Sequence, residues 1–85
     1  MQNKNLIKKI SDEVIELCRM NSLTKLTKLV VTVSHTSNVN EEKLIHRLRH
    51  SNKKIFGSWT HIKVLKDDIE ESTAILQALE GEKAI

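Results

Sequence analysis

The spacing of the apolar residues changes along the first third of the chain, and this change restricts the possible folds more than any other feature. In residues 25–33 apolar and polar side chains alternate, so that Leu29, Val31 and Val33 share one face, as in a β-strand. Before that, apolar residues recur at intervals of three and four, the pattern of an amphipathic helix: Leu6, Ile7, Ile10, Val14, Leu17 and Cys18. The sequence therefore predicts a helix followed by a strand.

A turn and a second helix follow this strand. The stretch SHTSN is rich in turn-forming residues, and Asn40 is a good N-cap for a helix over residues 41–50 that begins with two glutamates. The narrow apolar face of this helix consists of Leu44, Ile45 and Leu48. Residues 58–66 then alternate between apolar and polar positions, which predicts a second strand. We expect the two strands to pair antiparallel.

The last segment fits two interpretations. Asp68 followed by Glu71 has the spacing of a capping box. The apolar positions that follow favour a final helix that stops at Gly81, although the segment also fits a third strand. The sequence thus predicts an α+β domain of two layers, ordered helix–strand–helix–strand–helix, or with a third strand in last place. Because a two-stranded sheet is marginal, the first order also predicts a homo-oligomer whose sheets join across the interface.

The length and the single cysteine set the class of protein. Eighty-five residues form one domain, residues 1–85, and a chain this short gains stability from self-association. Cys18 lies in the apolar stripe of the first helix, so we expect a buried, reduced thiol that suits a reducing compartment. No apolar run is long enough to cross a membrane, and the first residues lack the apolar core of a secretory signal. We therefore expect a cytoplasmic protein with no membrane partner.

The net charge of +3 is unevenly distributed. Residues 1–66 contain thirteen Lys and Arg against five Asp and Glu, whereas residues 67–85 contain one Lys against six acids. Either the basic part binds an anionic partner, or the acidic segment folds back and neutralises its own domain. Charge alone leaves both interpretations open.

The motifs of common enzymes are missing from the sequence. It contains no glycine-rich phosphate loop, no CxxC pair, no nucleophile elbow and no zinc-protease motif, so we expect a protein that is not an enzyme and has no cofactor. His46 and His50 lie four residues apart on one face of the second helix. They could hold a metal ion if His35 or His61 supplied a third ligand. A histidine-based metal carrier is therefore one alternative, although the basic neighbours of these histidines repel cations.

A basic run in and after the second helix suggests another alternative. It consists of Lys43, Arg47, Arg49, Lys53 and Lys54, and Trp59 follows it. Cations that contact phosphates, together with an aromatic ring that stacks on bases, can grip nucleic acid. A small nucleic-acid-binding domain could therefore use the helix and its continuation, residues 41–54. Against this, the chain has only two aromatic residues, which a small core needs, and it has no RNP motif or GxxG loop.

The first strand and the turn after it share a pattern with a known family. The residues of this pattern are Lys25, Leu29, Val31, Val33, Ser37, Asn38, Val39 and Leu44. Through them, residues 5–66 resemble the nickel-binding lobe of the HypA-type accessory proteins, which insert nickel into hydrogenase and urease. That family has an amphipathic N-terminal helix, a strand of pattern K-x-x-x-V-x-V-x-I-G, and a turn of pattern S-G-V-x-x-x-x-L that enters a helix. The family's later G-x-x-L-x-I strand resembles residues 57–64.

The chain departs from this family at the metal ligands. Family members bind nickel through an N-terminal Met-His-Glu, whereas this chain begins Met1, Gln2, Asn3. The family's zinc lobe, with two CxxC pairs, has no counterpart here. The resemblance therefore implies the scaffold and a partner protein, but not the metal sites. We expect a non-enzymatic accessory or interaction domain that presents residues 41–50 and 58–66 to a protein with an acidic surface.

Overall fold

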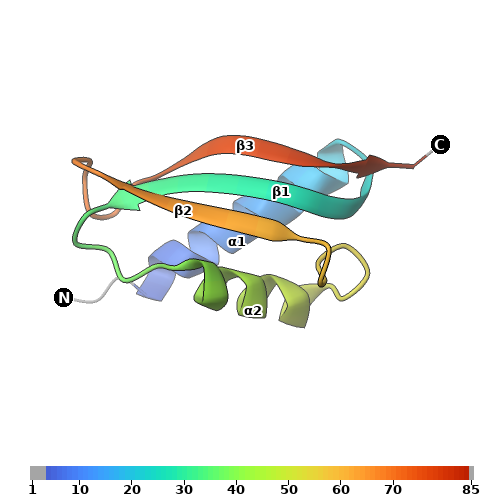
Figure 1. Ribbon diagram of the computed structural model, residues 1–85, viewed down its shortest axis with the longest axis horizontal. Coiled ribbons are helices and arrows are strands. Elements are labelled where there is room, and N and C mark those ends of the chain that lie inside the picture. The colour runs from blue at the N-terminus through green and yellow to red at the C-terminus, as the bar shows by residue number, and fades with distance from the viewer. Residues whose placement is uncertain (1–3, 85) are drawn as a thin grey trace.

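The computed structural model describes residues 4–84, which form two helices and one three-stranded sheet (Figure 1). The sheet lies in front of α1 in this view, and α2 lies alongside β2. The elements in chain order are α1 (Lys4–Met20), β1 (Leu23–Ser34), α2 (Glu41–Ser51), β2 (His61–Asp67) and β3 (Ala74–Lys83). The predicted α+β class is confirmed. No helix among the described residues is long and apolar enough to cross a membrane.

The central strand of the sheet is β1, with β2 on one side and β3 on the other. It runs parallel to β2, with Val31 opposite Val64, and antiparallel to β3, with Val30 opposite Ala78. The prediction that the first two strands pair antiparallel was therefore wrong. Parallel neighbours need a long crossover, and the segment between β1 and β2 provides one because it contains the whole of α2.

The predicted final helix is also wrong, and the alternative of a third strand is confirmed. Residues 74–83 are rich in Ala, Leu, Gln and Glu, which are good helix formers. However, β1 is twelve residues long, and β2 covers only one of its edges. A strand at 74–83 satisfies the backbone groups of the other edge, so tertiary pairing overrides the local helix propensity. Asp68 and Glu71 lie in the turn between β2 and β3 and cap no helix.

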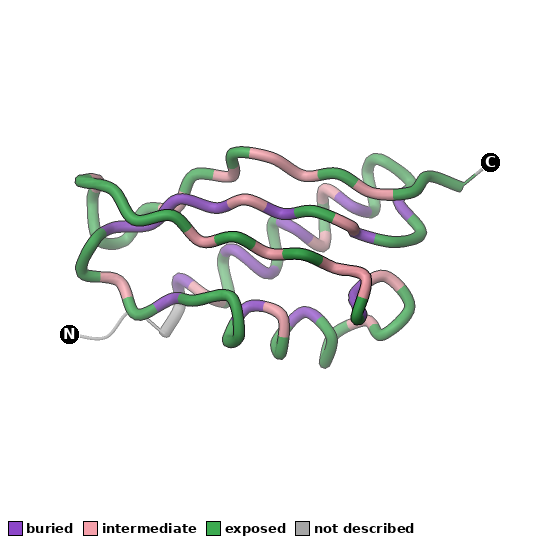
Figure 2. The backbone as a smooth tube through the Cα atoms, in the orientation of Figure 1, coloured by how far each residue is buried: buried purple, intermediate pink, exposed green. Residues whose placement is uncertain are grey.

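The core lies between β1 and the two helices, as the buried positions in Figure 2 show. The predicted apolar faces of the first helix and the first strand are confirmed there, and Cys18 is fully buried. The buried apolar residues are Leu6, Ile10, Val14, Cys18, Leu23, Leu26, Leu29, Val31, Val33, Val39, Leu44, Leu48 and Phe56. By contrast, no residue of β2 or β3 is fully buried, so both outer strands carry apolar side chains that remain partly exposed.

The start of α2 follows the prediction from sequence. Asn40 has an extended backbone, and its side chain accepts a hydrogen bond from the backbone N–H of Lys43 at 2.8 Å. This bond satisfies one of the free donors in the first turn. Glu41 and Glu42 occupy the same turn, where negative charge is favourable. The cap therefore fixes where α2 begins.

Candidate functional site

Four of the predicted site residues come together on the outer side of α2. His46, Arg49, His50 and Lys53 line one shallow hollow. All four side chains are exposed, and no carboxylate lines the hollow. Helical spacing brings the first three together, and the chain that leaves the helix adds Lys53. This hollow is basic throughout, so it is suited to an anionic group.

Two further basic residues extend this surface along the helix. Lys43 and Arg47 line a neighbouring hollow, which shares His46 with the first one. Its other lining residues are Ile7 of α1, Asn40 and the acidic Glu42. The ammonium of Lys43 donates a hydrogen bond to the carbonyl of Asn38 at 3.1 Å. We call the surface formed by Lys43, His46, Arg47, Arg49, His50 and Lys53 the basic ridge.

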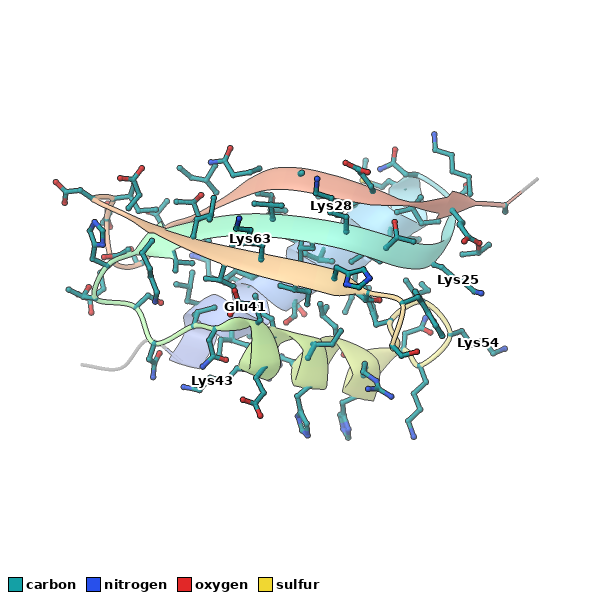
Figure 3. The ribbon with its side chains drawn as sticks, viewed as in Figure 1. Lys25, Lys28, Glu41, Lys43, Lys54 and Lys63 are labelled. Atoms are coloured by element: carbon teal, nitrogen blue, oxygen red, sulfur yellow. The ribbon has the colours of Figure 1, made fainter. Side chains whose placement is uncertain are left out.

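The last two predicted residues, Lys54 and Trp59, lie beyond the helix. Lys54 is exposed in the loop after α2 (Figure 3). The half-buried indole of Trp59 donates from Nε1 to the carbonyl of Ile55 at 3.0 Å. A Cβ at Gly57 would lie only 2.5 Å from this ring, so the indole packs directly on the glycine backbone. The Nζ atom of Lys25 lies 5.0 Å from the ring centroid, at cation–π distance. Trp59 thus holds the loop together.

The acidic C-terminal segment pairs with β1 and forms no ion pair with α2 within residues 4–84. Glu80 forms an ion pair with Lys28 at 3.8 Å, and the register places Glu82 opposite Lys25. The other ion pairs within residues 4–84 join neighbours on α1. No residue of the basic ridge takes part in an ion pair within the described chain. The charge of the ridge is therefore not neutralised by the acidic segment.

Glu41 has a role that the sequence did not predict. Its carboxylate accepts a hydrogen bond from the backbone N–H of Val64 at 2.8 Å, on the side of β2 that faces away from β1. This bond, with help from the helix N-terminus and from Lys66, lowers the pKa of Glu41 below its ordinary value. The ammonium of Lys66 donates to the carbonyls of Ser37 and Val39. Side chains thus tie the free edge of β2 to α2 and to the loop before it.

The four histidines do not converge. His46 and His50 lie on α2, whereas His35 follows β1 and His61 begins β2. Within residues 4–84, no three His, Cys, Asp or Glu side chains are grouped closely enough to hold a metal ion. A metal carrier based on the two helical histidines therefore receives no third ligand from the described part of the chain.

A second basic surface was not foreseen because it depends on strand register. Lys28 and Lys63 point out of the sheet face that the helices leave uncovered (Figure 3). The parallel register places His61 opposite Lys28 and Lys63 opposite Val30, so residues 33 or more positions apart become neighbours. No local sequence pattern could have indicated this proximity.

Comparison with protein-family models, with curated proteins and with solved structures found no match to this chain.

Proposed function

We propose that this protein is a non-enzymatic interaction domain whose basic ridge binds the acidic surface of another protein. The observation that carries the proposal is the distribution of its own acids. Glu80 of the acidic segment pairs with Lys28 of β1, while the ridge residues are exposed and take part in no ion pair within the described chain. A cluster of unpaired cations raises the local potential and attracts an anionic partner.

A protein partner fits the ridge better than a single-stranded nucleic acid does. Binding to single strands relies on aromatic rings that stack on bases. Phe56 is fully buried, and Trp59 is held by Ile55, Gly57 and Lys25. The ridge itself carries no aromatic residue. Its cations therefore offer charge and hydrogen-bond donors without a stacking platform.

The resemblance to the HypA-type scaffold supports the same proposal. The matching residues belong to the family's scaffold, so what this chain would share with the family is a scaffold that docks onto a partner protein. We accordingly propose an accessory domain. The buried thiol of Cys18 suits a reducing compartment, so we place the protein in the cytoplasm.

Fluorescence anisotropy with two labelled probes tests the proposal. One probe is an oligoglutamate peptide, and the other is a single-stranded oligonucleotide of the same net charge. The ridge variant combines Arg47→Gln, Arg49→Gln and Lys53→Gln. We expect this variant to weaken peptide binding about tenfold, and added salt to weaken the binding of the unmodified protein.

The control variant combines Lys9→Gln, Lys28→Gln and Lys63→Gln, three exposed lysines outside the ridge. It removes the same charge, so it separates a local site from an effect of net charge. Equal losses in both variants would contradict a site on the ridge. Tighter binding of the oligonucleotide, lost in the ridge variant alone, would instead favour the nucleic-acid-binding alternative.

A further inference from the structure

The two edge strands of the sheet differ in whether side chains from other elements bond to their outward backbone groups. On β2, α2 supplies Glu41 to the outward N–H of Val64, and Lys66 reaches back to two loop carbonyls. Native proteins protect edge strands in this way, because an open row of N–H and C=O groups pairs with any other strand. The edge at β2 is therefore closed to further strands near its middle.

The edge at β3 has no such protection. In Figure 1 no described element lies beyond β3. Within residues 4–84, the side chains that bond to its backbone are Thr24 and Thr27, and both come from β1. The strand is ten residues long, contains no proline and has a single lysine, Lys83, at its end. Its register against β1 shifts near Gln77, between Glu80 and Gly81, and between Glu82 and Lys83, while residues 74–83 remain one strand.

Partly exposed apolar side chains lie on both faces of this open edge. On the uncovered face of the sheet, Ile75 is 42 % exposed. On the face toward the helices, Leu76 and Leu79 are only half-buried. A hollow beside the end of the strand is lined by Leu79 together with Leu17 and Leu23. A strand added here would gain backbone hydrogen bonds and bury apolar surface on both of its faces.

We propose that this edge pairs with β3 of a second copy of the chain, in antiparallel orientation. The charges of β3 lie in its second half, at Glu80, Glu82 and Lys83, whereas residues 74–78 are uncharged. A two-fold axis near the middle of the strand places each charged half opposite an uncharged half, so that like charges do not face one another. The product is a continuous six-stranded sheet that leaves the basic ridges of both copies free.

Sedimentation equilibrium and hydrogen exchange test the pairing. At high micromolar concentration we expect a mass of twice the 9.8 kDa of one chain, and slow exchange of the outward amides of β3 that becomes fast on dilution. The variant Ile75→Glu places a carboxylate on the open edge, where this pairing sets it opposite Glu82 of the second copy. It should raise the dissociation constant of the dimer about tenfold or more.

Leu65→Glu is the matched control, because Leu65 lies on the same sheet face, is 38 % exposed and belongs to the protected strand β2. It should leave the dimer intact. A dimer lost equally in both variants would show that the sheets pack face to face, which overturns the pairing of edges. A dimer that resists Ile75→Glu overturns it as well. A monomer at every concentration, with fast exchange along β3, would also refute the proposal.

Discussion

The contribution of the hydrogen bond from Val64 to Glu41 to the stability of the fold can be measured with a single substitution. Glu41→Ala removes a charged acceptor, and hydrogen bonds to charged groups contribute about 1.5–3 kcal/mol. The carboxylate of Glu41 is largely exposed, so screening by water reduces the expected loss to about 1 kcal/mol. In a domain of this size that loss lowers Tm by about 4–8 °C.

Glu42→Ala is the matched control for this prediction. Both glutamates lie in the first turn of α2 and interact with the helix N-terminus, but only Glu41 is bonded to β2 within the described chain. Thermal unfolding of the two variants should therefore differ by the strength of the single bond. Hydrogen exchange adds an independent check, because the amide of Val64 should exchange faster in Glu41→Ala alone. Equal unfolding temperatures together with unchanged exchange would refute this account of the edge.

The pH dependence follows from the same bond. The pKa of Glu41 is lowered in the folded protein from the ordinary 4.5, so the bond stabilises the fold fully above that value. The stabilisation is lost as the pH falls through the lowered pKa and the carboxylate becomes protonated. The difference in stability between the unmodified protein and Glu41→Gln should shrink over that acidic range. A difference that stays constant down to low pH would contradict this assignment.

Three further predictions concern the core and the loop after α2. The hydroxyl of Ser11 is buried without a hydrogen-bond partner among the described residues, so Ser11→Ala should stabilise the protein by about 1 kcal/mol in urea unfolding; a loss of stability would mean that the hydroxyl has a partner. Gly57→Ala would drive a Cβ into the ring of Trp59, which should destabilise the fold by about 1–3 kcal/mol. The displaced ring should also shift the tryptophan fluorescence emission to the red. Unchanged emission would count against the packing of the ring on Gly57. Burial raises the pKa of the Cys18 thiol, so Ellman's reagent should label it slowly until the protein is unfolded; fast labelling of the native protein would contradict its burial.

Local sequence patterns predicted the structure correctly wherever an element depends only on residues that are close in the chain. The spacing of three and four from Leu6 to Cys18 predicted α1, and Asn40 with the two glutamates behind it predicted the start of α2. The same helical spacing places His46, Arg49 and His50 at one hollow. These features depend on residues within a turn or two of each other, where backbone geometry fixes the side-chain directions.

The sequence by itself thus determined the two helices, the first two strands, the buried faces of α1, β1 and α2, and the basic character of α2. Tertiary structure alone decided the rest. The alternation in residues 61–67 is the same for either strand direction, and only the crossover through α2 makes β2 parallel to β1. The helix-forming residues 74–83 became a strand because β1 needed a partner for its second edge. The protected and open edges, and the pairing of Glu80 with Lys28, arise from contacts between residues far apart in the chain, which no local pattern encodes.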